Sequence, residues 1–204
     1  MPSSEPRSQK VARRLGEPSV TWADSRLIRA CLNGNEQAWA ALIAKYKNLI
    51  YSIPLKYGAT PQDAADIFQS VCVELFSELP KLRKTQALRS WLMTVTAHQA
   101  FRWKRRTQRR AEDELTEVEE AQLPTDVPPD LIETVEREQI LREAIARLPA
   151  RCQEIIRLLF YEADPVPYQD LAARLGLARG SIGFIRGRCL KRLERLLQEA
   201  GFRR

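Results

Sequence analysis

The residues best suited to chemistry in this sequence are cations and aromatics that alternate near its middle. Residues 81–110 contain ten Lys or Arg and no Asp or Glu, and Phe101 and Trp103 lie among them. Aromatic rings between cations are how proteins stack unpaired bases while they bind the phosphate backbone. A solvated helix face is the alternative interpretation, and Trp91 and Phe101 also suit a core. The segment predicts a surface for single-stranded or melted nucleic acid, with Trp103 as the stacking residue.

A second cationic segment, residues 168–197, has the pattern of a helix-turn-helix. Gly176 suits the left-handed turn between its helices. Arginine recurs on the outer faces of the last helix, and guanidinium groups pair with phosphates and guanine edges. Gly183 and Gly187 should each cost a helix about 1 kcal/mol. Close approach to duplex DNA would explain them, but so would close helix packing in a structural bundle.

The sequence lacks the residue patterns that catalysis or metal binding would need. The sequence has no carboxylate cluster in the basic segment, no glycine-rich phosphate loop, and no nucleophile beside a base, so we expect no catalytic residue. Four cysteines, far apart and among apolar neighbours, predict buried thiols in a reducing cytosol: Cys31, Cys72, Cys152 and Cys189. With His98 as the single histidine, we expect no metal site and no cofactor.

The composition agrees with a nucleic-acid partner. A net charge of +7 favours polyanions, and 44% hydrophobic with 29% charged residues supports a packed core. No run approaches the roughly 20 apolar residues of a membrane span, and residues 1–20 lack the apolar centre of a signal peptide. We therefore expect a cytoplasmic protein without membrane insertion.

Helical patterns must position these residues. Asp24 and Asn35 are expected N-caps, and Thr60-Pro61-Gln62-Asp63 is a strong helix start, with a hydroxyl cap and a proline in the first turn. Two apolar rows along the helix that follows predict its buried face and leave Asp66 and Gln69 outside it. These rows are Ile67, Val71 and Leu75, and beside them Phe68, Cys72 and Phe76.

The charge pattern divides the chain. Residues 111–133 carry nine acidic residues, no basic one and three prolines, without sustained periodicity, and helices resume near Thr134. We predict an all-α protein of two small helical domains, residues 23–110 and 134–204. A disordered basic tail at residues 1–22 precedes them, and residues 111–133 form an acidic flexible linker.

In this order and spacing, residues 24–197 resemble the extracytoplasmic-function branch of the sigma family of bacterial transcription initiation factors. The run Asp63-Ala64-Ala65-Asp66-Ile67-Phe68-Gln69 is similar to that family's polymerase-binding helix, and Leu88-Arg89-Ser90-Trp91-Leu92 to its promoter-melting segment. Its second domain, which reads the minus-thirty-five element, is similar to Leu148-Pro149-Ala150-Arg151 and Gly180-Ser181-Ile182-Gly183.

The resemblance implies a role for individual residues. Asp66 and Gln69 would meet the clamp helices of the β′ subunit. Minus-ten DNA would contact Trp91, His98, Arg102, Trp103, Arg105 and Arg106, and minus-thirty-five DNA would contact Arg179, Ser181, Gly183, Phe184, Arg186 and Arg188. His98 stands where many members carry Asn, at a position associated with a captured minus-ten base.

The implied partners are core RNA polymerase, through its clamp helices and β flap, and promoter DNA. An anti-sigma factor is left open, as are the promoters served. The acidic linker would imitate nucleic acid in the polymerase's cationic channel, with ordinary solubility as the alternative. Two rival functions remain, a stand-alone helix-turn-helix regulator and, less well supported by these residues, a nuclease or recombinase.

Overall fold

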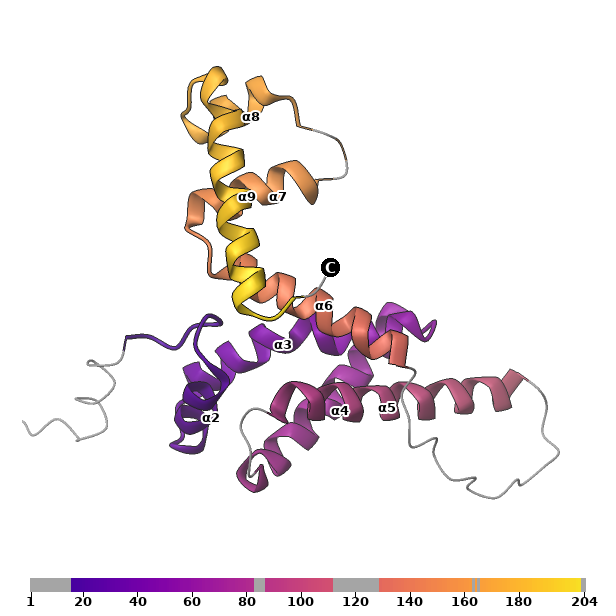
Figure 1. Ribbon diagram of the computed structural model, residues 1–204. Helices are drawn as coiled ribbons and strands as arrows, with labels where there is room; N and C mark the ends of the chain where they lie inside the picture. Colours follow the sequence, from indigo (N-terminus) through magenta and orange to yellow (C-terminus); the bar gives the residue numbers. More distant parts are fainter. Residues whose placement is uncertain (1–15, 83–86, 112–128, 163, 165, 203–204) are drawn as a thin grey trace, which may run out of the picture. The chain divides into compact units, whose positions relative to one another are not determined.

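The structure is a computed structural model that describes residues 16–82, 87–111, 129–162, 164 and 166–202. These residues form helices and no strands, which confirms the all-α prediction. The chain separates into two compact units, residues 1–135 and 136–204 (Figure 1). Within the described ranges, no helix is both long and apolar enough to cross a membrane. Most of the predicted tail and most of the predicted linker lie outside the described residues.

The first unit is built around one long helix. This is α3 (Glu36–Lys56), which packs against α2 (Asp24–Leu32), α4 (Pro61–Glu78) and α5 (Leu88–Ala111). The short 3-10 helix η1 (Leu79–Lys81) follows α4. Large apolar side chains from all four α-helices meet in one core, in which Leu42, Leu75 and Leu92 are almost completely buried.

Side-chain caps fix where two of these helices begin. Asn35 Oδ1 accepts a hydrogen bond from the Ala38 amide at 2.9 Å, and Thr60 Oγ1 accepts one from the Asp63 amide at 3.2 Å. Both caps were predicted. The Asp24 cap was wrong, because Ala23 is the N-cap of α2 and Asp24 lies in its first turn.

Asp24 instead ties α2 to α3. Its carboxylate accepts hydrogen bonds from Lys45 Nζ at 2.7 Å and from the Tyr46 hydroxyl at 2.6 Å. Lys45 also donates to the Trp22 carbonyl at 3.0 Å, and the Arg26 guanidinium lies 3.3 Å from the centre of the Trp22 ring. Trp22 therefore packs on the first core, although the predicted tail included it.

The helix after the acidic stretch starts earlier than predicted. α6 (Pro129–Ala146) includes residues that were assigned to the linker. Proline suits a first helical position, Asp130 lies in the first turn, and Leu131, Ile132 and Val135 supply apolar contacts to the first core. The proline and the acid, taken as linker signals, are here start signals.

The second unit contains the helix-turn-helix. α7 (Ala150–Phe160) precedes α8 (Tyr168–Leu175), and the 3-10 helix η3 (Arg179–Ser181) leads into α9 (Ile182–Glu199). Gly176 ends α8 with a left-handed φ of 62°, as predicted, and the Leu177 amide then reaches the Ala172 carbonyl at 2.8 Å.

Two cysteines correct the prediction of four reduced thiols. Cys152 of α7 and Cys189 of α9 form a disulfide, with 5.3 Å between their Cα atoms. Cys31 and Cys72 are free. The bonded pair is 37 residues apart in the sequence, so only the packing of α7 against α9 brings it together.

Candidate nucleic-acid and protein interfaces

The outer side of α4 carries one continuous exposed row. Asp66, Gln69, Val73 and Phe76 follow one another at steps of three and four residues, which places them on one helix face. Asp66 and Gln69 are exposed, as predicted. Val73 is 71% and Phe76 68% exposed, which is unusual for large apolar side chains this close together. An apolar patch that adjoins polar groups in this way is typical of a protein-binding surface.

Phe76 was wrongly assigned to the buried face. The true core residues of α4 are Ala64, Ile67, Val71 and Leu75, while Phe68 and Cys72 are only partly buried. Phe76 lies beyond the edge of that stripe, where its ring meets Trp39 of α3 at a centroid distance of 5.3 Å. Sequence periodicity predicted two adjacent apolar rows on α4. Together these rows are wider than the part of the α4 surface that α3 and α5 cover.

Trp103 of α5 is part of the packed side of its helix. The buried Leu92, Thr96 and Ala100 lead to it at steps of four, four and three residues, and its ring packs against the first core. Its side chain also hydrogen-bonds the Asp63 carboxylate at the start of α4. The periodicity that includes Thr96 could have revealed this. Trp103 is therefore only partly exposed, and its role as a stacking residue stays a prediction.

Asp63 holds a small network at the start of α4. The Thr60 hydroxyl donates to its carboxylate at 2.5 Å. Hydrogen bonds from Thr60 and then Trp103 lower the pKa of the Asp63 carboxyl below its ordinary value, because they stabilise the ionised form. This network links the start of α4 to α5, in addition to the packing between the two helices.

A different side of α5 collects the other predicted DNA residues. Steps of seven, four and three residues place Trp91, His98, Arg102 and Arg105 on one face, away from the stripe that holds Trp103. Arg102 is exposed, as is the neighbouring Arg106, whereas Trp91 is partly buried against the core. The face changes along the helix from packed aromatic to exposed cation.

His98 lies where that change occurs. His98 as a whole is partly exposed. Its Nε2 atom, however, is buried and has no hydrogen-bond partner among the described residues. The accessible part of the side chain is therefore not Nε2. Any contact that His98 makes with an extruded base would use the remainder of the ring.

The first turns of α9 present an open face. Gly183 and Gly187 are exposed, and a Cβ atom added at either position would meet nothing within 4 Å. Packing inside this unit therefore does not explain these two glycines. Phe184 is 69% exposed, and the Arg188 guanidinium lies 5.7 Å from the centre of its ring.

The other predicted duplex-reading residues are held in different ways. Arg186 donates a 2.7 Å hydrogen bond to the Tyr168 hydroxyl at the start of α8, which links the two helices of the motif. The Ser181 hydroxyl donates to the Ala178 carbonyl at 2.7 Å. Arg179 lies in η3, and its side chain is outside the described residues.

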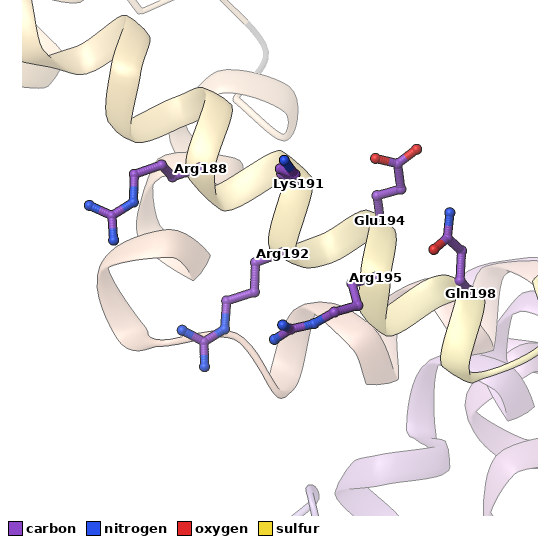
Figure 2. A pocket seen from close by; sticks show the side chains of 6 residues that line it. All are labelled: Arg188, Lys191, Arg192, Glu194, Arg195 and Gln198. Carbon is purple, nitrogen blue, oxygen red and sulfur yellow. The ribbon is translucent and has the colours of Figure 1, made fainter.

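The cations continue beyond the predicted residues of α9. Figure 2 shows a shallow groove whose lining residues all come from this helix. Four of them form what we call the cationic strip, namely Arg188, Lys191, Arg192 and Arg195. All four are exposed, and Glu194 is the single acid in the lining. The strip extends the positive surface by nearly two helical turns.

Comparisons with known proteins place this geometry in context. Residues 42–110 match the family described as sigma-70 region 2. The RNA polymerase sigma-H factor of Pseudomonas aeruginosa is 25% identical over 189 residues, which cover 87% of this chain and 97% of that protein. A structure of CnrH in complex with the cytosolic domain of CnrY is 20% identical, covers 87% of this chain and 99% of CnrH, and has a TM-score of 0.39.

Proposed function

We propose that this chain is a sigma factor of the extracytoplasmic-function branch, and that three of its helices have separate roles in its work with RNA polymerase. A sigma factor binds the core enzyme and directs it to promoters, so core polymerase and promoter DNA are its partners. In the proposal, α4 docks on polymerase, α5 holds melted DNA, and α9 reads the upstream duplex. The protein performs no catalysis itself and works in the cytoplasm.

The observation that carries the proposal is the exposed row on α4, inside the segment that matches region 2. Asp66 and Gln69 form its polar end and contact the clamp helices of the β′ subunit. Val73 and Phe76 extend the same face, so we assign them to the same contact. Covering two such side chains contributes roughly 1.5 to 3 kcal/mol each.

The test compares variants of the row in binding to core polymerase. Asp66→Ala with Gln69→Ala, and separately Val73→Ser with Phe76→Ala, should each weaken the affinity at least about tenfold, or roughly 1.4 kcal/mol. Both pairs are exposed, so the fold should survive. Matched controls are Glu36→Ala with Gln37→Ala, and Leu32→Ser with Leu55→Ser, which change exposed residues on α2 and α3. Equal affinity for all four variants would refute docking through α4.

For α5 we propose that His98 borders the site of an extruded minus-ten base. It shares a face with Arg102 and Arg105, whose charges suit the phosphates beside such a base. His98→Asn should change the preferred base at one position and leave polymerase affinity unchanged. Run-off transcription from promoters randomised across the minus-ten element, read by sequencing, measures this. An unaltered preference at every position would assign His98 to the core.

For α9 we propose that Gly183, Phe184 and Arg188 face the major groove, while the other three residues of the cationic strip follow the adjoining phosphates. The open space at Gly183 and Gly187 supports this proposal, because packing inside the unit does not require glycine at either position. Arg186 would contact DNA from a position that Tyr168 fixes. Footprinting of polymerase with Phe184→Ala and Arg188→Gln should show a weakened upstream element, with the minus-ten footprint retained.

A further inference from the structure

We propose that the Cys152–Cys189 disulfide makes the second unit sensitive to reduction, so that a cellular dithiol loosens the duplex-reading helices while the first unit stays intact. The expected effect on DNA rests on the proposed function of α9. The effect on stability does not.

The bond occupies a critical place in a small core. Cys189 is 1% exposed and belongs to the cluster around Ile155, Leu171 and Ile182. Cys152 packs against that cluster and also against a second one around Leu148 and Leu193. The disulfide thus joins α7 to α9 where the two clusters meet.

The loop that the disulfide closes contains most of the reading apparatus. Between Cys152 and Cys189 lie α8, the turn at Gly176, η3 and the first turns of α9. Closing a loop of 37 residues restricts the unfolded chain and so favours the folded state. Breaking the bond therefore affects the elements that carry Gly183, Phe184 and Arg188 together.

The first unit has no equivalent weakness in its cysteines. Cys31 and Cys72 are free, and burial raises the pKa of Cys31 to about 11 and that of Cys72 above its ordinary value. Raised pKa values leave little thiolate, which is the reactive form. At moderate pH, thiol–disulfide exchange therefore occurs at the Cys152–Cys189 disulfide of the second unit rather than at the free thiols of the first.

The chemistry is ordinary thiol exchange. A thiolate of the dithiol attacks Cys152 Sγ, because Cys152 is the more exposed partner, and Cys189 leaves as a thiolate. The second thiolate of the reductant then attacks its own sulfur in the mixed disulfide and releases Cys152. Two electrons pass to the protein, both cysteines take up a proton, and the reductant becomes a disulfide.

The experiment uses the full chain, purified without reductant and then treated with or without dithiothreitol. Thiol counting after denaturation should find two of four cysteines free before reduction. Hydrogen exchange followed with temperature resolves the two units. Reduction should lower the midpoint of the second unit by roughly 10 °C and leave the first unchanged. At that lowered midpoint half of the second units are unfolded, so the affinity for upstream duplex in fluorescence anisotropy should fall about twofold.

Two variants complete the test. Cys152→Ala with Cys189→Ala should show the low midpoint with or without dithiothreitol, and Cys31→Ala with Cys72→Ala should respond as the unaltered protein does. Four free thiols before reduction, or a second unit with the same midpoint in both states, would overturn the inference. A shifted midpoint in a protein that never binds upstream duplex would instead refute the proposed role of α9 and leave the redox inference standing.

Discussion

The two units of this protein achieve order by different means. The first has one core to which α2, α3, α4 and α5 all contribute, and Leu42, Tyr46 and Leu92 are nearly inaccessible there. The second unit divides its apolar residues between two small clusters. A small domain buries a smaller share of its surface, so less hydrophobic free energy offsets its loss of chain entropy.

Specific cross-links make up part of that difference in the second unit. The disulfide joins α7 to α9, and the Arg186–Tyr168 hydrogen bond joins α9 to α8. In the first unit the corresponding links, such as Asp24 with Lys45, supplement a core that is already extensive. The comparison teaches that core packing holds the docking helix α4 in place. The position of the reading helix α9 depends more on the disulfide and the Arg186–Tyr168 hydrogen bond.

The most severe test applies the same substitution to both cores. Leu42→Ala and Leu171→Ala each remove a side chain that is 0% exposed and should cost about 3 kcal/mol. The first unit should remain folded with Leu42→Ala, while the second should lose its protection from hydrogen exchange with Leu171→Ala. Exchange measured by mass spectrometry separates the units. A second unit that tolerates its substitution better than the first would reverse the comparison.

Neutralising the cationic strip tests whether the reading unit uses it. Lys191→Gln, Arg192→Gln and Arg195→Gln together should weaken binding to upstream duplex and reduce its salt dependence, by about one unit of slope for each phosphate that the strip no longer neutralises. Fluorescence anisotropy over a salt series measures the slope. The control is Arg147→Gln with Arg151→Gln, which changes exposed arginines outside α9. An unaltered slope would show that the strip is only a solvated face.

A smaller effect of opposite sign is expected at Gly183. Gly183→Ala meets no atom within 4 Å in this protein and should stabilise α9 by about 1 kcal/mol. The same methyl group should lower the affinity for duplex DNA, because it occupies the face that approaches the groove. Thermal unfolding and anisotropy are the two measurements. Higher stability with unchanged affinity would separate this glycine from DNA contact.

The smallest effect concerns the network at the start of α4. The Asp63 carboxyl has a lowered pKa in the folded protein, so its contribution is fully present above its unfolded value, near pH 4, and disappears as the pH falls through the lower folded value. Unfolding followed between about pH 5 and pH 2 should show a gentler loss of stability in Asp63→Asn. Identical curves would mean that the Thr60 and Trp103 hydrogen bonds have no energetic role.

Local sequence signals predicted many features of the fold because they act between neighbours. Asn35 and Thr60 cap their helices through amides three residues ahead, and Gly176 ends α8 with a conformation that glycine adopts at little cost. Order and spacing of motifs likewise pointed to the sigma family, whose region 2 matches residues 42–110. The roles of individual site residues remain predictions, although the structure places Asp66 and Gln69 on an exposed face.

Tertiary structure alone decided which of several equivalent side chains is covered. Phe68 and Phe76 are the same residue type in the same apolar row, yet Phe68 stacks on Tyr51 while Phe76 remains largely exposed. Likewise, the sequence shows Cys152 and Cys189 only as apolar positions of two helices. The packing of α7 against α9 brings them close enough to form a disulfide. A helix's own periodicity fixes which side chains share a face. How far that face is buried, and what it meets across a distance of many residues, depends on the neighbouring helices, which no local pattern encodes.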